Sequence, residues 1–317
     1  MTRIKELAEK IRSETEKIIT GKSEQIKLIT IAVLAGGHVL IDDVPGVGKT
    51  TLIKTMSKVL GCDFKRIQFV PDMLPADITG MQIYNQKTND FELREGPVMT
   101  NILLADEINR AIPRTQSALL EAMEEHQVSI DGQILTLPEP FVVLATQNPI
   151  ESESTFRLPA AQMDRFMFRF SMGYPKPDEE KKMLANLGDK IPFETVNAVT
   201  DAAELSALSK EIANVNLGDE VSSYIIRLVN ATREHGKLKA GASPRASRAM
   251  YRAAKVYAAI NGRDYVTPDD VKALAHPLLE HRLILNGGLR LSNVSAGAIL
   301  DEILEETLAS PKVTDQL

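Results

Sequence analysis

Residues 41–51 combine glycines, a lysine and two threonines in an order that suits phosphate binding. The segment reads Ile41-Asp42-Asp43-Val44-Pro45-Gly46-Val47-Gly48-Lys49-Thr50-Thr51, and it joins a short apolar run to a helical pattern. Glycines let backbone N–H groups close around phosphate oxygens, and the N-terminal end of the following helix attracts anions. Lys49 would reach the β- and γ-phosphates of a nucleotide, and the Thr50 hydroxyl would bind Mg²⁺. The alternative is a glycine turn that binds nothing.

We predict that the nucleotide-contacting residues run without a break from the apolar run into the helix. They are Asp43, Val44, Pro45, Gly46, Val47, Gly48, Lys49, Thr50 and Thr51. Phosphate-binding loops usually have glycine at the position of Asp43, so this residue departs from the common pattern. The Gly-x-Gly-Lys-Thr end of the loop and its strand–loop–helix setting are intact.

A second apolar run, residues 102–105, is followed directly by the carboxylates of Asp106 and Glu107. The carboxyl ends of parallel strands are where open α/β sheets bind ligands. Asp106 would hold the hydration shell of Mg²⁺, and Glu107 would orient and activate a water molecule for attack on the γ-phosphate. Taken alone, two acids after an apolar run indicate only the end of a strand. Their distance from the glycine loop favours the catalytic role.

A third apolar run, residues 141–145, ends in the polar residues Thr146, Gln147 and Asn148. Asn148 would position the attacking water or contact the γ-phosphate. The simpler alternative is that Asn148 and Pro149 start a turn.

Two arginines lie at the edges of predicted elements. Arg165 follows Asp164 and precedes a strand-like run at residues 167–170. Arg245 falls in the first turn of a helix that Ser243 would cap, where a fixed cation would reach the γ-phosphate from a second domain. Taken alone, a surface ion pair is the simpler interpretation of either arginine. The sequence assigns no role to Arg110, Arg114 or Arg248.

The elements that would position these residues alternate between strands and helices. Apolar runs at 39–41, 102–105 and 141–145 predict strands buried on both faces. Helical periodicity predicts two helices within 1–35, the second capped by Ser23, and further helices at 50–60 and 115–125. This alternation predicts an α/β fold with a parallel sheet. Asp131-Gly132 between two β-prone runs predicts a hairpin over 128–137.

The pattern changes near residues 174–178, where two prolines mark a linker. Beyond the linker strand signals are few, and helices begin with recognisable caps, as at Thr267, where Pro268 and Asp270 complete a capping pattern. We therefore predict an α/β nucleotide-binding domain over 1–175, which includes the N-terminal helices, and a smaller all-α lid domain over 176–317.

Composition indicates an ordinary globular protein. The 317 residues are 44% hydrophobic, and 37 basic against 43 acidic residues give a net charge of −6. This acidic balance weighs against nucleic acid as an obligatory partner. Cys62 is the only cysteine, which excludes an intrachain disulfide and a cysteine-based zinc site. The N-terminus is charged and no apolar stretch reaches about 20 residues, so we expect a cytoplasmic protein that meets membranes only through a partner.

In this order, the chemical segments resemble the Walker A, Walker B, sensor 1, arginine finger and sensor 2 motifs of the AAA+ superfamily. Longer strings narrow the resemblance to MoxR-type ATPases: Phe69-Val70-Pro71-Asp72-Met73-Leu74-Pro75-Ala76-Asp77-Ile78-Thr79-Gly80, Asp106-Glu107-Ile108-Asn109-Arg110-Ala111, Gln116-Ser117-Ala118-Leu119-Leu120-Glu121-Ala122-Met123, Ala145-Thr146-Gln147-Asn148-Pro149 and Asp164-Arg165-Phe166. The resemblance covers nearly the whole chain, and Asp43 is usual in it. It implies a five-stranded parallel sheet, a helix-2 insertion at about 70–97, a pre-sensor hairpin at 128–137 and a helical lid.

The resemblance also implies a function. ATP and Mg²⁺ would be the cofactors, and Arg165 would be supplied in trans to a neighbour in a homo-oligomeric ring, often a hexamer. MoxR-type ATPases act as chaperones with von Willebrand factor A-domain proteins, so we expect ATP hydrolysis to drive remodelling or maturation of a protein partner. A nucleotide-gated switch with slow hydrolysis and a nucleic-acid motor are the alternatives, and the acidic balance disfavours the motor.

Overall fold

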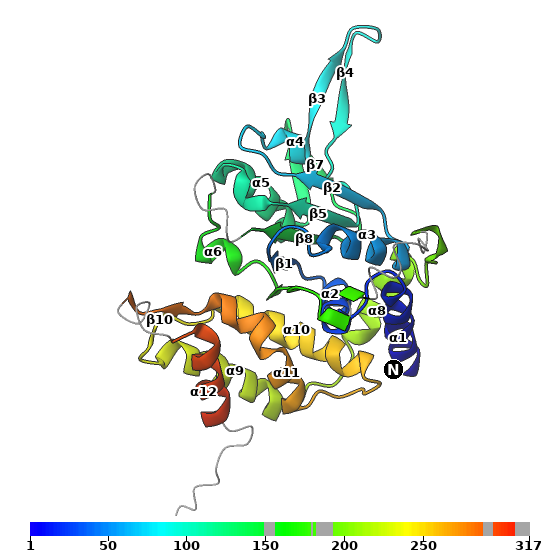
Figure 1. Ribbon diagram of the computed structural model, residues 1–317. Helices are drawn as coiled ribbons and strands as arrows, with labels where there is room; N and C mark the ends of the chain where they lie inside the picture. Colours follow the sequence, from blue (N-terminus) through cyan, green and yellow to red (C-terminus); the bar gives the residue numbers. More distant parts are fainter. Residues whose placement is uncertain (149–155, 179, 182–192, 288–293, 308–317) are drawn as a thin grey trace, which may run out of the picture.

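A five-stranded parallel sheet forms the centre of the nucleotide-binding half (Figure 1). The computed structural model describes residues 1–148, 156–178, 180–181, 193–287 and 294–307. The sheet order is β2-β5-β8-β1-β9, so β2 and β9 are its edges. The strands are β1 (Val39–Asp42), β2 (Phe64–Gln68), β5 (Ile102–Asp106), β8 (Val142–Gln147) and β9 (Phe168–Phe170). All pairings between them are parallel, which confirms the predicted α/β class.

The central strands β1, β5 and β8 correspond to the three apolar runs. Edge strand β2 has no such run, because it reads Phe-Lys-Arg-Ile-Gln and only Ile67 within it is buried. A strand that is paired on one side and half exposed needs no continuous apolar stretch. The hydrophobic pattern therefore does not reveal β2.

Alternate residues of the central strands supply a hydrophobic core on each face of the sheet. Val39 and Ile41 of β1 belong to a core with α1 (Thr2–Glu16), α2 (Ser23–Ala35) and α3 (Lys49–Val59), and this core continues into the C-terminal helices. Leu40 belongs to the opposite core, which includes α5 (Pro113–Glu125). Because the first core includes C-terminal residues, continuous packing joins the two halves of the chain.

Two hairpins are found where the sequence predicts insertions. Strands β3 (Gly80–Asn85) and β4 (Asp90–Glu95) follow the short helix α4 (Ala76–Thr79) and form the long arm that projects from the sheet in Figure 1. Strands β6 (Gln127–Ile130) and β7 (Gln133–Thr136) pair across a turn at Asp131 and Gly132, whose φ angles are 48° and 84°. Two successive positive φ angles fit the type I′ turn that an Asp-Gly pair favours.

The described part of the C-terminal half is mainly helical and also contains two short strands. Its helices are α8 (Ala202–Ile212), α9 (Asp219–Glu234), α10 (Pro244–Ile260), α11 (Pro268–Leu279) and α12 (Ala296–Glu306). Strands β10 (Leu238–Ala240) and β11 (Ile284–Leu285) form a small antiparallel sheet, which corrects the prediction of an all-α lid. Strands this short show no period-2 pattern in a sequence. Other short helices of the described chain are α6 (Ala160–Met163), η1 (Ile108–Arg110), η2 (Phe193–Thr195) and η3 (Glu280–Arg282).

Helix caps include both correct predictions and a wrong one. Thr267 and Asp270 form the predicted capping box of α11, and Ser243 accepts a hydrogen bond from the Arg245 N–H as the N-cap of α10. Ser23 is not an N-cap, because α2 begins at Ser23 itself and Lys22 precedes it as the capping residue. The Ser23 hydroxyl instead donates to Glu16, the last residue of α1.

The boundary between residues 175 and 176 stays a prediction. Helices α1 and α2 pack against α10 as well as against the sheet side of the molecule, so the N-terminal helices contact both halves. Within the described residues, no helix has the length and apolarity needed to span a bilayer. The polar segment 310–317 lies outside the described residues.

Candidate active site

One cavity lies at the carboxyl ends of β1, β5 and β8. It has a volume of about 330 Å³ and is lined by nine described residues: Pro45, Gly46, Gly48, Lys49, Thr50, Thr51, Asp106, Glu107 and Asn148. The sequence predicted all of them as site residues. They meet because β1, β8 and β5 are neighbours in the sheet, and the carboxyl ends of parallel neighbours share one edge.

Two glycines shape the loop between β1 and α3. Gly46 and Gly48 have φ angles of 87° and 86°, in the left-handed region that favours glycine. A Cβ atom at either position would meet nothing within 4 Å, so conformation rather than crowding accounts for the glycines. Helix α3 begins at Lys49, and the unpaired N–H groups of its first turn lie at the cavity. This backbone arrangement can bind phosphate.

The carboxylate of Asp43 binds the segment that follows β9. Its Oδ2 atom accepts hydrogen bonds from the Met172 N–H at 2.7 Å, the Gly173 N–H at 2.9 Å and the Ser171 hydroxyl at 3.1 Å. Its Oδ1 atom accepts from the Val44 N–H at 2.9 Å. Asp43 is buried, and these contacts attach the phosphate loop to the chain that leads toward the lid.

Lys49 contacts the backbone of the loop itself. Its Nζ atom donates to the Asp43 carbonyl oxygen at 2.8 Å. Asp43, Val44 and Val47, which the sequence placed among the nucleotide contacts, do not line the cavity. Their predicted contact with nucleotide therefore stays a prediction, whereas Lys49, Thr50 and Thr51 are part of the cavity lining.

Asp106 is held by both neighbouring strands. Its Oδ1 atom accepts the Thr146 hydroxyl from β8 at 2.6 Å. Its Oδ2 atom accepts Nη2 and Nε of Arg66 from β2, at 2.7 Å and 3.2 Å. These contacts fix the direction of the carboxylate before any ligand binds.

The oxygen atoms of Thr50 and Asp106 suit Mg²⁺, which prefers hard oxygen ligands and keeps several waters. Both residues line the cavity beside Lys49. No group of three or more His, Cys, Asp or Glu side chains in the described part of the chain could hold a metal by itself. The site therefore fits a Mg²⁺ ion that is bound largely through nucleotide phosphates and water.

Glu107 has a left-handed backbone with a φ angle of 56°. Such a conformation costs a non-glycine residue about 1 kcal/mol or more and is often found at functional sites. The Glu107 N–H donates to the Thr146 hydroxyl oxygen at 2.9 Å, and its Oε2 atom accepts Gln68 Nε2 at 2.6 Å and Arg110 Nε at 3.0 Å. Contacts from β2, β8 and η1 thus hold the predicted general base in place.

Asn148 directly follows β8, is buried and lines the cavity. Its carbonyl oxygen accepts Asn109 Nδ2 at 3.3 Å, which fixes the backbone from which the side chain extends. Pro149, the other half of the predicted turn, lies outside the described residues.

Arg165 and Arg245 meet at a different place. Arg165 Nη2 lies 3.2 Å from Glu124 Oε2, and Arg245 forms an ion pair with the other oxygen of the same carboxylate. Neither arginine lines the cavity that contains Lys49 and Glu107. The structure therefore brings the two predicted arginines to each other, and not to the phosphate loop of their own chain.

Sequence reasoning assigned no role to several residues that contact the predicted site, among them Arg66, Gln68, Arg110, Glu124 and Thr146. Gln68 ends β2 as Asp106 ends β5, so a polar residue after a strand was the available signal, but β2 itself had not been recognised. Glu124 is one of several acids on α5, and no spacing distinguishes it from its neighbours.

Comparison with known proteins relates this geometry to a family. The family described as "ATPase family associated with various cellular activities (AAA)" matches residues 38–168, and the "AAA lid domain" matches residues 230–303. Chaperone MoxR1 of Mycobacterium tuberculosis is 41% identical over 309 residues, which cover 95% of this chain and 81% of that protein. This chain belongs to the MoxR family of AAA+ ATPases. ATP hydrolysis is the activity that the family assigns to it.

Other proteins are similar to this MoxR-family protein over most of its length. The uncharacterised protein YeaC of Bacillus subtilis is 48% identical over 288 residues, which cover 91% of this chain and 90% of YeaC. A crystal structure of a protein assigned as an ATPase, from Cytophaga hutchinsonii, is 38% identical, has a TM-score of 0.91 and covers 97% of this chain and 96% of that one. An MCM homologue from Methanopyrus kandleri, at 19% identity and a TM-score of 0.61, shares the fold.

Proposed function

We propose that this MoxR-family ATPase works as a homo-oligomeric ring whose Mg·ATP cycle remodels a protein partner. The observation that carries the proposal is the position of Arg165 and Arg245. Both bind Glu124, outside the cavity of Lys49 and Glu107. Transfer of the γ-phosphoryl group builds negative charge that a guanidinium stabilises. A second copy of the chain would supply that guanidinium.

Within one subunit the residues of the cavity would have separate tasks. Lys49 and the N–H groups of the loop bind the phosphates. Thr50 and Asp106 would hold Mg²⁺, which offsets the charge of the phosphates when it is bound. Glu107 orients the attacking water and accepts its proton, and Asn148 keeps the water in line with the bond that breaks.

The contact between subunits would be head to tail, since one face carries the cavity and another carries the arginines. A contact of this kind closes into a ring when the rotation between subunits fits. The family resemblance favours a hexamer. Activity should then increase with protein concentration as subunits assemble.

The exposed surface of the β3–β4 arm suits contact with a protein partner. The arm exposes several large apolar side chains: Met81, Ile83, Tyr84, Phe91 and Leu93. Tyr84, Phe91 and Leu93 share one face of the hairpin, and Met81 and Ile83 share the other. Exposed groups of apolar residues indicate contact with other proteins, whereas nucleic-acid surfaces are rich in lysine and arginine. The name of the relative Chaperone MoxR1 agrees with such a role. A cytoplasmic von Willebrand factor A-domain protein would link the ring to its substrate, and to a membrane where one is involved.

Mixing two inactive variants tests the shared site. Lys49→Ala subunits lack a working cavity but keep Arg165, and Arg165→Ala subunits bind ATP but lack the guanidinium. Neither variant should hydrolyse ATP alone, and a mixture should recover part of the wild-type rate. Native mass measurement confirms that the two variants assemble together. A co-assembled mixture without activity, or a fully active Arg165→Ala variant, contradicts the proposal.

A trapping variant tests the remodelling role. Glu107→Gln subunits loaded with ATP should retain a protein partner that Lys49→Ala subunits do not retain. The purified partner should then raise the ATP turnover of the wild-type ring. A partner that binds without altering turnover supports the nucleotide-gated switch, and tight binding of a labelled duplex supports the nucleic-acid motor.

A further inference from the structure

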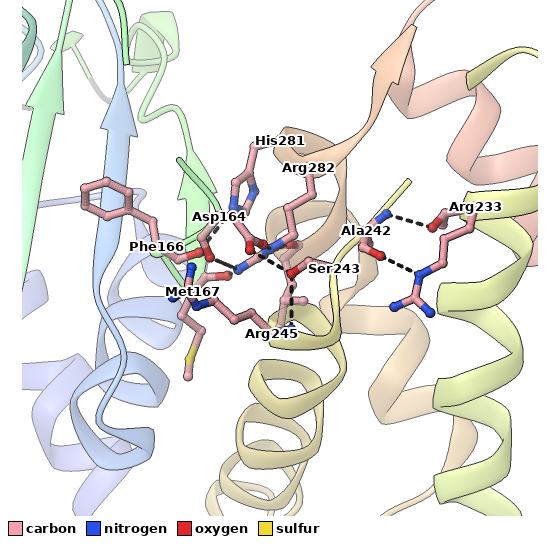
Figure 2. A network of polar contacts seen from close by, with 11 residues as sticks. Asp164, Phe166, Met167, Arg233, Ala242, Ser243, Arg245, His281 and Arg282 are labelled. Atoms are coloured by element: carbon pink, nitrogen blue, oxygen red, sulfur yellow. Dashed lines mark hydrogen bonds and ion pairs between the residues drawn. The ribbon is translucent and has the colours of Figure 1, made fainter. Parts of the chain in front are cut away.

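A buried arginine of the lid reaches the backbone that carries Arg165. Arg282 belongs to η3, after α11, and its side chain is only 3% exposed. Figure 2 shows Arg282 and His281 extending from the lid toward Asp164 and Phe166, the two residues on either side of Arg165. The contact joins residues more than 100 positions apart in the chain.

The Arg282 guanidinium uses all of its N–H donors at this place. Nε donates to Asp164 Oδ1 at 2.8 Å, and Nη2 donates to the carbonyl oxygens of Asp164 at 3.1 Å and Phe166 at 2.7 Å. Nη1 donates to the carbonyl oxygens of Leu278 and, at 3.4 Å, Met167. A guanidinium has five N–H donors in one plane, and here each meets an acceptor.

The segment on either side of Arg165 is fixed from other directions as well. The Phe166 side chain is fully buried in one core of the sheet, and the Met167 N–H donates to the His38 carbonyl oxygen at 2.8 Å. His281 Nε2 lies 3.2 Å from the Phe166 carbonyl oxygen. Burial lowers the pKa of His281 well below its usual range, so the ring is neutral and Nε2–H is the donor. Arg165 is the residue of this segment that extends to solvent and to Glu124.

The lid side of the contact is equally well defined. The Ser243 hydroxyl donates to Asp164 Oδ2 at 2.7 Å, so the two oxygens of Asp164 bind two separate parts of the lid. Arg233 Nε of α9 donates to the Ala242 carbonyl oxygen at 2.8 Å, and this hydrogen bond fixes the backbone segment before Ser243 (Figure 2). Asp164 is thereby held by η3 and by the start of α10 together.

Stability alone is a weak reason for such an arrangement. Burial lowers the pKa of the Arg282 guanidinium while Asp164 opposes that shift, which shows the cost of removing the cation from water. A well-packed apolar pair of the same size often stabilises a fold as much as a buried ion pair does. What a planar guanidinium adds is a fixed orientation of each group that it contacts.

We propose that Arg282 is a positioning residue for Arg165: the lid of each subunit sets the place of the arginine that the same subunit supplies to its neighbour. The inference rests on the proposed function, since it requires Arg165 to act in trans. A change in the lid angle of one subunit would therefore move its Arg165 relative to the ATP bound by the neighbouring subunit. In this way the lid of one subunit controls the rate of ATP hydrolysis in its neighbour.

The mixing experiment tests this inference when Arg282→Lys is added to one partner at a time. Lysine keeps the charge but replaces the planar fork by a single ammonium group. Placed in the Lys49→Ala subunit, which supplies Arg165, Arg282→Lys should reduce the recovered rate by about 100-fold, the effect of a displacement of about 1 Å in a catalytic group. Placed in the Arg165→Ala subunit, which binds the ATP, it should leave the recovered rate close to that of the unmodified mixture.

Arg263→Lys is the matched control. Like Arg282, Arg263 forms an ion pair with an aspartate through its guanidinium, here a two-pronged pair with the buried Asp270, but both of these residues lie within the lid. Arg263→Lys should have the same small effect on the recovered rate in either subunit. Asp164→Asn in the subunit that supplies Arg165 is a second test if Arg282→Lys lowers stability, and it should reproduce the one-sided loss.

Equal losses from both placements of Arg282→Lys would assign Arg282 a general structural role and overturn the inference. An unchanged rate from both placements would also overturn it, because Arg165 would then keep its place without Arg282. If the mixture of Lys49→Ala and Arg165→Ala subunits has no ATPase activity while Arg282 is intact, the shared site itself is refuted. This outcome is distinct from the two outcomes that overturn the role of Arg282 alone.

Discussion

The side-chain amide of Gln68 donates a 2.6 Å hydrogen bond to the carboxylate of Glu107. The bond joins the carboxyl ends of β2 and β5, which are neighbours in the sheet, and Arg110 contacts the same oxygen at 3.0 Å. Both donors compete with an attacking water for that oxygen. The predicted general base is therefore restrained by two residues that are not part of the cavity lining.

Gln68→Ala should raise the basal ATPase rate by about fivefold, because it removes one hydrogen bond worth about 1 kcal/mol from the restrained state of Glu107. The steady-state rate at saturating ATP measures this effect. A lower rate with an unchanged KM for ATP would show the opposite, namely that Gln68 positions Glu107 for the reaction.

Asp43→Gly should lower the free energy of unfolding more than it lowers the affinity for ATP. It would restore the residue that phosphate-binding loops usually have, but it would leave the buried Met172 N–H without its acceptor, whereas the Gly173 N–H would keep the Ser171 hydroxyl oxygen at 3.1 Å. An unsatisfied buried donor costs about 1–3 kcal/mol, so the free energy of unfolding should fall by about 1–3 kcal/mol. Urea unfolding and an ATP titration measure the two quantities.

Asp43→Asn is the control for that change, since it keeps the size of the side chain and one acceptor oxygen. It should lose less stability than Asp43→Gly. If Asp43→Gly instead keeps its stability and loses its affinity for ATP, Asp43 is a nucleotide ligand, as its position in the sequence first suggested.

Folding stability should decrease as the pH falls below about 6.5. His38 is buried between β8 and α5, where its Nδ1 accepts the Val143 N–H and its Nε2 contacts the Met123 carbonyl oxygen. Burial lowers the pKa of His38 to about 4, and electrostatic interactions with nearby His126 and Arg252 add to the shift. The unfolded chain takes up a proton near pH 6.5 and the folded chain does not. Unfolding therefore becomes easier by about 2 kcal/mol between pH 7 and pH 5.

Urea unfolding at pH 7.5, 6 and 5 measures this dependence. His38→Gln should be less stable at pH 7.5 but should lose less stability on acidification than the wild type. The exposed lid residue His276 provides the control, and His276→Gln should keep the wild-type pH dependence. An unchanged pH dependence in His38→Gln would assign the effect to another group, such as the buried His281.

The strands and loops that hold the cavity could be predicted because local sequence determines them. Val39 to Ile41 are apolar on both faces of a strand, and Gly46 and Gly48 are required by positive φ angles. The same logic predicted the Asp131-Gly132 turn. Each of these features depends on residues within a few positions of one another, so a single sequence contains the information.

The contacts that organise the arginines could not be predicted, because they join distant parts of the chain. Arg282 is charged and buried, yet a hydrophobic pattern places charged residues at the surface. Its partner Asp164 lies 118 positions away, and only the packing of η3 against α6 brings the two together. Glu124 likewise acquires its importance from Arg165 and Arg245, which reach it from two separate elements.

The ion pair with Glu124 also leads to an expectation about which nucleotide Arg245 reaches. An arginine that acts on the ATP of its own chain would have to lie at the cavity of Lys49, whereas Arg245 lies beside Arg165 on Glu124. Arg165 and Arg245 bind the two oxygens of one carboxylate, so a neighbouring cavity that meets Arg165 would also meet Arg245. We therefore expect Arg245 to act in trans together with Arg165.

Arg245→Ala should leave the affinity of a dilute single subunit for ATP unchanged. It should lower the turnover of the assembled ring by about 100-fold or more. Removal of the guanidinium lowers the rate of phosphoryl transfer by about 10³–10⁵ where a single arginine finger acts alone. A fluorescent ATP analogue measures affinity below the assembly concentration, and the steady-state rate above it measures turnover. Lys49→Ala, which should lose affinity even as a single subunit, is the reference for a residue that acts in its own site. If Arg245→Ala weakens ATP binding in the dilute subunit as Lys49→Ala does, Arg245 serves its own nucleotide, and the lid must swing away from Glu124 to bring it there.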